Sequence, residues 1–267
     1  MEFFTIFEQF GTNGFFAKFN NVLSGLNEAD KLGLIPFIDY QTNHSNLYDP
    51  TNTEIKNEWE YCFIQDYDYD IVYNSRIVKS HSSFNGWPPP QEKNFRNKEL
   101  VSRLNFLYEK YIKVKPEILS KLNNEITNFK TLAVHCRRSD MEHHHSNIAL
   151  KYSDELFFEK TMKIFNDGNF EKIYLATEEI SIIEFFKEKI GEQLFYQDCF
   201  RVYRNDSPVH KNDERHNHRT LQCQEVLIDA LNMSKCDSLL CGISGVSNAT
   251  TYINGLKFNN VFYFDEI

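Results

Sequence analysis

A histidine, two adjacent arginines and an aspartate end one apolar run of this chain. The stretch LAVHCRRSD, residues 132–140, closes that run with His135, Arg137, Arg138 and Asp140. Guanidinium groups fork onto phosphate or carboxylate oxygens and stay charged at physiological pH. In a chain with a net charge of −9, two adjacent guanidiniums indicate a local site for an anion. The alternative is a solvated basic turn beside a core histidine, because loop charges are often only hydrated.

Two further apolar runs end in small or polar residues. Thr177 and Glu178 follow the run IYLA, and Gly242–Ser247 follows the run SLLC and precedes a helical pattern. A small-residue turn that opens a helix presents backbone N–H groups to a phosphate. Ser244 and Ser247 would act as phosphate ligands or as helix caps, and the two roles are compatible.

Asp229 interrupts the apolar face of the helical pattern QEVLIDALNMSKC. A carboxylate in such a place is more often a paired buried group. It is also able to accept hydrogen bonds from the edge of a guanine base. The sequence leaves both interpretations of Asp229 open.

Alternating strand and helix patterns must position these side chains. In the second half we expect strands at 131–135, 173–176, 194–196, 238–241 and 261–264, and helices at 154–165, 180–190, 222–234 and 246–253. In the first half we expect strands at 3–7 and 35–38, a helix at 15–32, loops with short strands over 41–92, and helices at 97–111 and 116–128. This alternation predicts an α/β fold with a doubly wound parallel sheet, which binds ligands at the carboxyl ends of its strands.

Length, charge and composition limit the remaining possibilities. The 267 residues allow one large domain or two smaller ones, and we place a boundary near residue 129, between domains 1–129 and 130–267. The acidic balance argues against a nucleic-acid partner, because neutralising phosphates along a duplex requires a basic face. No apolar run of about 18 residues and no signal-peptide pattern is seen, so we expect no integral membrane segment and a cytoplasmic protein. The six cysteines form no CxxC pair and are expected to be free core thiols.

The segment VHCRRSD resembles the HxRRxD motif of the fucosyltransferases that include the α1,6-, the protein O- and the nodulation fucosyltransferases. The resemblance continues through IYLATEE and EVLIDALNMSKCDSLLCGISGVS, and more weakly through FGTNGFFAKFNNVLSGLNEADKLG. The resemblance covers most of residues 130–255, and the chain is most similar to soluble bacterial members of the family. It implies a GT-B arrangement of two Rossmann-like domains facing across a cleft. It also implies GDP-fucose as the donor, a glycan or glycoconjugate acceptor, no metal cofactor, and inversion at the transferred sugar.

The resemblance also implies roles for individual residues, by their position in the matching segments. His135 and Asp229 would meet the guanine base. Arg137 and Arg138 would hold the diphosphate and stabilise it as it leaves, and Asp140 would orient the two arginines.

Further parts of the site follow from the same resemblance. Ser244, with Ser247 or nearby backbone, would complete the phosphate cradle, and the loop Gly11-Thr12-Asn13-Gly14 would approach the donor from the opposite domain. Where relatives carry a Ser-Ser pair, this chain has Ser244-Gly245. Either Glu142 or His145 would serve as the base that deprotonates the acceptor hydroxyl.

Three other functions compete with this interpretation. The histidine strings at 143–145 and 216–218 suggest a metal site or a nuclease, but neither has the spacing of a zinc motif, and no basic patch accompanies them. A glycosyltransferase with another GDP-sugar donor is a second alternative, because nothing in the sequence reads the 6-methyl group of fucose. A non-catalytic protein that binds nucleotide-sugars or glycans on the same scaffold is the third.

Overall fold

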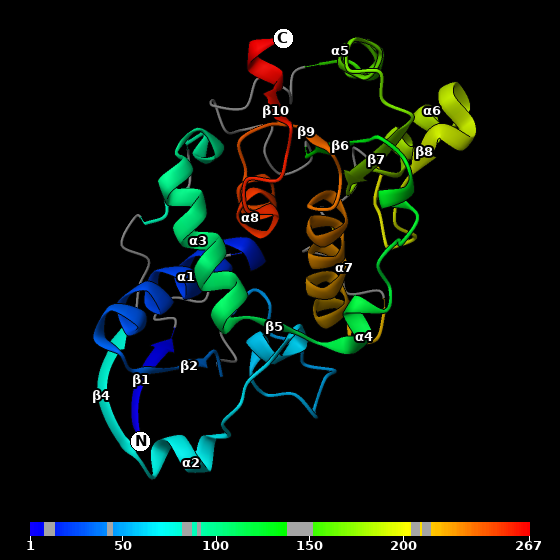
Figure 1. Cartoon of the computed structure of the whole chain (residues 1–267). Helices are drawn as coiled ribbons and strands as arrows, with labels where there is room; N and C mark the ends of the chain where they lie inside the picture. The colour runs from blue at the N-terminus through cyan, green and yellow to red at the C-terminus, as the bar shows by residue number, and fades with distance from the viewer. Residues whose placement is uncertain are drawn as a thin grey trace.

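The structure is a computed structural model of the chain, and it describes residues 1–7, 14–41, 45–81, 87–89, 92–137, 152–203, 209 and 215–267. Two parallel sheets lie at opposite ends of the molecule, and helices fill the space between them (Figure 1). Among the described residues, no helix is long and apolar enough to cross a bilayer.

The second half of the chain forms a five-stranded parallel sheet. Its strands are β6 (Thr131–Cys136), β7 (Lys172–Thr177), β8 (Leu194–Phe195), β9 (Ser238–Cys241) and β10 (Asn260–Tyr263). The spatial order is β10-β9-β6-β7-β8. The chain starts at β6 in the middle and adds β7 and β8 on one side, then returns to add β9 and β10 on the other side of β6. The prediction of a doubly wound parallel sheet is therefore confirmed. The order reverses between β6 and β9, and such a switch point is where open α/β sheets bind their ligands.

Helices cover both faces of this sheet. They are α5 (Asp154–Asp167), α6 (Ile180–Ile190), α7 (His218–Met233) and α8 (Gly245–Asn254). Because side chains alternate along a strand, Leu132 and Val134 pack with the α5 and α6 side, whereas Ala133 packs with the α7 and α8 side. The four predicted helices of this half are confirmed. Ser153 caps α5, and its Oγ accepts a hydrogen bond from the Leu156 N–H at 3.3 Å.

The first half forms a smaller parallel sheet of order β2-β1-β4. Its strands are β1 (Glu2–Phe7), β2 (Ile35–Asp39) and β4 (Arg76–His81). Helix α1 (Phe15–Leu32) joins the first two strands with the predicted bounds, and Gly33 ends it with a left-handed φ of 65°. A short helix, α2 (Tyr69–Tyr73), packs on the sheet through Val72.

The remaining elements connect the two sheets. They are an antiparallel pair, β3 (Phe63–Ile64) and β5 (Lys113–Val114), helices α3 (Lys98–Tyr111) and α4 (Pro116–Leu119), and the 3-10 turns η1 (Glu58–Tyr61), η2 (Asn94–Arg96), η3 (Ile126–Asn128), η6 (Gly191–Gln193) and η8 (Phe264–Glu266). The single helix predicted over 116–128 is wrong, because the range forms the short helix α4 and the separate 3-10 turn η3. The Asn123 side chain accepts from the Glu125 N–H at 2.9 Å, and the Asn123 N–H donates to Asn232 Oδ1 at 3.0 Å. Both bonds compete with the helical pattern.

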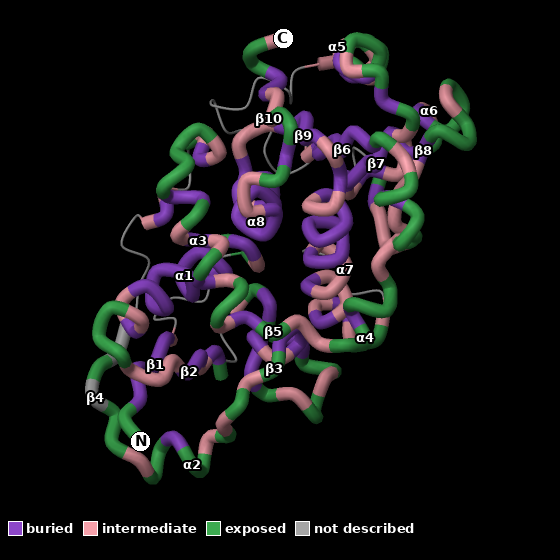
Figure 2. The backbone as a smooth tube through the Cα atoms, in the orientation of Figure 1, coloured by how far each residue is buried: buried purple, intermediate pink, exposed green. Residues whose placement is uncertain are grey.

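One hydrophobic cluster extends across both halves. It includes Phe19 and Leu26 on α1, Leu104 on α3, Leu227 on α7 and Tyr252 on α8. Figure 2 shows α1, α7 and α8 largely buried or half-buried between the two sheets, whereas α3 is mostly half-buried or exposed and contributes a few buried residues. The two halves are therefore packed against each other through a common core, and the boundary at residue 129 stays a prediction.

Polar contacts also join the halves at the start of α7. The side chain of Asn217, the N-cap residue, makes no capping hydrogen bond. Asp49 from the first half accepts a hydrogen bond from the first turn of α7 in its place. Asp49 is 1% exposed, and its Oδ2 accepts from the Thr220 N–H at 2.9 Å. Thr51 Oγ1 accepts from the Asn217 N–H at 2.8 Å and donates to Asp49 Oδ1 at 2.6 Å. The first half thus supplies the helix cap that the second half lacks.

We expect Asp49→Ala to lower the free energy of unfolding by about 1–2 kcal/mol, the cost of a lost helix cap. Burial raises the pKa of Asp49, but the hydrogen bonds from Thr220 and Thr51 outweigh it and leave the pKa below its ordinary value. The stabilisation is therefore present at pH values above about 4 and is lost as the pH falls through the depressed pKa. Urea unfolding at pH 7 and at acid pH measures both effects. Asp66→Ala is the control, because Asp66 is exposed and pairs with Lys113 on the surface. A loss as large as that of Asp49→Ala would contradict the capping role.

Candidate functional site

His135 lies at the switch point of the second sheet. It is 7% exposed and pairs in register with Ala176 on β7 and Cys241 on β9. Its Nδ1 lies 3.5 Å from the Oγ of Ser244, which follows the neighbouring strand β9. Burial, helped by the nearby charge of Arg137, lowers the pKa of His135 to about 3. At neutral pH the ring is uncharged, so one nitrogen donates and the other accepts.

The first turn of α8 faces this histidine. Ser244 and Ser247 form a capping box, in which each side-chain oxygen accepts from the other residue's backbone N–H at 3.0 Å. The predicted capping role of Ser244 is confirmed. In the part of the chain that the structure describes, no group accepts from the N–H groups of Gly245 and Val246. These two donors at the positive end of the helix, beside a neutral histidine, can bind a phosphate oxygen.

The first turn of α1 packs against the first turn of α8. A Cβ atom on Gly245 would lie 3.1 Å from the Phe16 Cβ and 3.7 Å from the Phe16 carbonyl carbon. A contact of 3.1 Å is tighter than most Cβ atoms make, so the glycine lets the two first turns lie this close without displacing Phe16. Gly14, the N-cap of α1, therefore lies near the same site, and the N-terminal ends of two helices from opposite halves converge there.

We expect Gly245→Ala to destabilise the protein by about 1–3 kcal/mol, the usual cost of inserting a methyl group into a packed contact. The added Cβ would lie 3.1 Å from the Phe16 Cβ, so Phe16 on α1 must shift by a few tenths of an ångström to admit it. Thermal unfolding measures the change. Ser102→Ala on the exposed face of α3 is the control, and equal melting temperatures for the two variants would show that the contact yields at no cost.

Asp229 lies on α7 beside the middle of β7. It is 8% exposed, and its Oδ1 accepts from the Tyr174 hydroxyl at 2.7 Å. With its amide oriented to donate, Gln197 gives the same oxygen a second bond at 3.2 Å. Burial raises the pKa of Asp229 to about 6, against the opposing effects of Tyr174 and Arg201. Within the described residues nothing donates to Oδ2, so Asp229 is a paired buried group that keeps one oxygen available for a ligand.

The structure thus brings part of the predicted site together. His135, Ser244 and Ser247 meet at the switch point, and the partly buried Arg137 directly follows β6 next to His135. The other predicted site residues lie outside the described residues: Arg138, Asp140, Glu142, His145, Gly11 and Asn13.

The second histidine string has a structural role at His218. Its Nδ1 accepts from Arg215 Nε at 3.1 Å, and its Nε2 donates to the Val209 carbonyl at 2.9 Å. Among the residues that the structure describes, no cluster of three His, Cys, Asp or Glu side chains could hold a metal ion. The string at 143–145 lies outside those residues.

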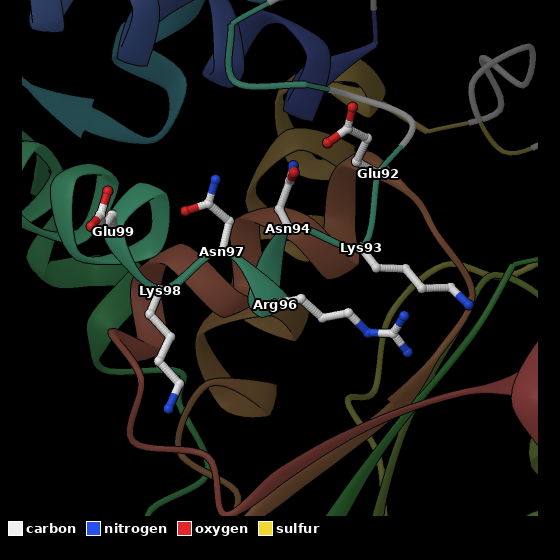
Figure 3. Close-up of a pocket in the computed structure, with 7 residues that line it drawn as sticks. All are labelled: Glu92, Lys93, Asn94, Arg96, Asn97, Lys98 and Glu99. Carbon is white, nitrogen blue, oxygen red and sulfur yellow. The ribbon is translucent and has the colours of Figure 1, made fainter.

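A separate surface hollow of about 480 Å³ lies at η2 and the start of α3 (Figure 3). Lys93 and Arg96 extend from it in the same direction, and both bind the carboxylates near the C-terminal end. Lys93 Nζ lies 2.7 Å from Asp265 Oδ2 and 2.6 Å from Glu266 Oε1. Lys93 and Arg96 are therefore engaged in holding η8, and the hollow is not the candidate site.

Sequence reasoning missed two residues near Asp229. Tyr174 lies inside an ordinary apolar strand pattern, and Arg201 lies in a segment without a motif. Arg201 donates from Nε to the Thr177 carbonyl at 3.1 Å, so it lies at the carboxyl end of β7. No spacing rule connects either residue with Asp229, because the sheet alone brings them together.

Solved structures share this architecture, although no family model and no curated protein sequence matches the chain. The NodZ α-1,6-fucosyltransferase co-crystallised with GDP is 14% identical, with a TM-score of 0.56 over 100% of this chain and 96% of that one. NodZ from Bradyrhizobium gives a TM-score of 0.57 at 14% identity, over 100% and 97% of the two chains. POFUT1 in complex with GDP gives 0.52 at 11% identity, over 98% of each chain. The chain therefore has the GT-B fold of these fucosyltransferase structures, as the sequence predicted.

Proposed function

We propose that the protein is a glycosyltransferase that transfers fucose from GDP-fucose to a glycan or glycoconjugate, without a metal ion and with inversion at the sugar. The observation that carries the proposal is the switch point, where neutral His135, the first turn of α8 and the first turn of α1 converge beside Arg137. The likeness to structures solved with GDP and with GDP-fucose supports the choice of donor.

The chemistry of the site suits the departure of a nucleoside diphosphate. Breaking the bond between the sugar and the β-phosphate leaves negative charge on that phosphate. Fixed guanidiniums and helix N-termini stabilise this charge in the transition state and require no reorganisation. In this proposal Arg137 and Arg138 supply the guanidiniums, Asp140 orients them, and the N–H groups of Gly245 and Val246 supply the helix dipole.

The remaining parts of the proposal concern the base and the acceptor. His135 and Asp229 bind the guanine, and the loop with Gly11, Asn13 and Gly14 closes the donor site from the first half. Glu142 or His145 deprotonates the acceptor hydroxyl. The acceptor binds against the first half, residues 1–129.

Nucleotide binding and product analysis test this function. We expect GDP to raise the melting temperature more than UDP or ADP, and EDTA to leave that rise unchanged. With GDP-fucose and a panel of acceptor glycans, we expect GDP release and a fucosylated product of inverted anomeric configuration by NMR. Stronger stabilisation by UDP would contradict the proposal.

The two alternatives give different results in the same assays. GDP-mannose turned over faster than GDP-fucose would identify a glycosyltransferase with another GDP-sugar donor. Tight GDP-fucose binding with no transfer and no slow hydrolysis would identify a binding protein.

A further inference from the structure

Arg201 is held at the carboxyl end of β7 by backbone contacts. The segment around it runs alongside the residues that follow β7, because Val202 N–H donates to the Glu178 carbonyl at 3.0 Å and the Val202 carbonyl accepts from the Ile180 N–H at 3.0 Å. The Arg201 side chain donates from Nε to the Thr177 carbonyl at 3.1 Å and from Nη1 to the Cys199 carbonyl at 3.4 Å. The guanidinium is thus fixed at the edge of the sheet where the candidate site lies.

The third nitrogen of this guanidinium is Nη2. Arg201 Nη2 is buried and has no hydrogen-bond partner in the part of the chain that the structure describes. A buried donor without an acceptor is costly, and more so when it carries charge. Such an atom is expected to gain an acceptor from a ligand or a bound water.

Arg201 belongs to the surroundings of Asp229. Its positive charge opposes the rise in the pKa of Asp229, so the two charges are within electrostatic reach. Gln197, four residues before Arg201, donates to Asp229 Oδ1 at 3.2 Å, and the Arg201 guanidinium carbon lies 5.7 Å from the centre of the Tyr196 ring. The segment from Tyr196 to Arg201 therefore runs from a contact with Asp229 Oδ1 to the end of β7.

A carboxylate acceptor beside a guanidinium donor is complementary to one edge of guanine. The base presents two donors, N1–H and the 2-amino group, next to an acceptor, O6. Adenine carries an amino group where guanine carries O6, and that donor would face the donors of an arginine. An edge inserted between Asp229 and Arg201 would give Nη2 its missing acceptor.

We propose that Arg201 determines base specificity by donating from Nη2 to the guanine O6, next to the N1–H and 2-amino contacts of Asp229. This inference rests on the proposed use of a GDP-sugar and names a residue that reads its base. Arg201 is a binding residue in this role, remote from the bond that breaks.

Base analogues test the contact by calorimetric titration. The probes are GDP, 6-thio-GDP, in which a poorly accepting sulfur replaces O6, and IDP, which lacks the 2-amino group. We expect the wild type to bind 6-thio-GDP about tenfold more weakly than GDP, as for one lost base contact. In Arg201→Met, which keeps the aliphatic stem, GDP affinity falls about tenfold and the difference between GDP and 6-thio-GDP disappears. The IDP difference, which depends on Asp229, persists.

Controls separate reading of the base from support of the fold. Arg76→Met removes an exposed arginine that pairs with Glu2 on the other sheet, and it should leave all three affinities unchanged. Arg201→Lys keeps the charge and, being unable to reproduce the fork, should also lose the 6-thio-GDP difference. If Arg201→Met does not fold, the difference in affinity between GDP and 6-thio-GDP, measured for the wild type and for Arg201→Lys, tests the contact instead.

The possible outcomes are distinct. A wild type that binds GDP and 6-thio-GDP equally shows that water or protein satisfies Nη2, and it overturns the inference. So does an Arg201→Met variant that weakens both nucleotides and keeps their ratio, because that result indicates a structural role. A wild type that binds no GDP contradicts the proposed function itself.

Discussion

Arg138→Ala is expected to lower the rate of fucose transfer by at least about 10²–10³-fold, the effect of removing one preorganised group that stabilises developing negative charge. The sequence places Arg138 two residues after the last residue of β6, at the strand end where His135 and the first turn of α8 meet. In the proposed function a charged residue at this strand end contacts the diphosphate of the donor. Turnover of GDP-fucose with excess acceptor measures the loss.

The controls for this prediction are a stability measurement and a conservative variant. The melting temperature of Arg138→Ala should match that of the wild type, because a charged residue that follows a strand is expected in a loop rather than in the core. Arg138→Lys should recover little activity, since an ammonium cannot fork onto two phosphate oxygens. A collapse of thermal stability in Arg138→Ala would instead identify a structural ion pair and would remove this residue from the proposed mechanism.

Asp229→Asn is expected to weaken GDP binding by about 10–100-fold, the range for losing one well-formed contact with a base edge. The amide keeps the shape of the side chain, and its oxygen still accepts from the Tyr174 hydroxyl. It replaces one carboxylate oxygen with a donor, which would face the N1–H or 2-amino donors of guanine. Titration with GDP at pH 8 measures the loss.

The pH dependence provides a second test of Asp229. Its pKa in the folded protein is about 6, so GDP affinity should fall as the pH drops below 6, where the carboxylate becomes protonated. This dependence should be absent from Asp229→Asn. A wild-type affinity that stays constant between pH 8 and pH 5 would show that the ionised carboxylate does not hold the base.

The contribution of Asp229 to folding stability should change with pH in the direction opposite to GDP affinity. The folded pKa of Asp229 is higher than the ordinary value near 3.9 of an unfolded chain, so protonation favours the folded state. That contribution is complete below about pH 4 and is lost as the pH rises through 6. Above pH 6 the wild type should therefore be no more stable than Asp229→Asn in thermal unfolding. Asp229→Asn is therefore expected to bind GDP poorly while it folds at least as stably as the wild type.

The sequence by itself determined most of the elements and one end of the site. Apolar periodicity fixes α1 at Phe15–Leu32, because burial of one helical face is a local property of spacing. The same holds for β6, whose short apolar run and polar ending place His135 next to the last residue of the strand. The capping role of Ser244 was also readable, since a cap is formed within four consecutive residues.

Only the tertiary structure decided which of these ends meet. The order β10-β9-β6-β7-β8 brings Ser244 to His135, although 109 residues separate them. The cap of α7 by Asp49 and the glycine contact of α1 with α8 depend on packing between the two halves. The structure likewise places Arg201 near the site, through a hydrogen bond from its side chain to the Thr177 carbonyl of β7. Spacing rules describe interactions within one turn or one strand, whereas these contacts arise where separate elements pack, and no local pattern encodes the partner.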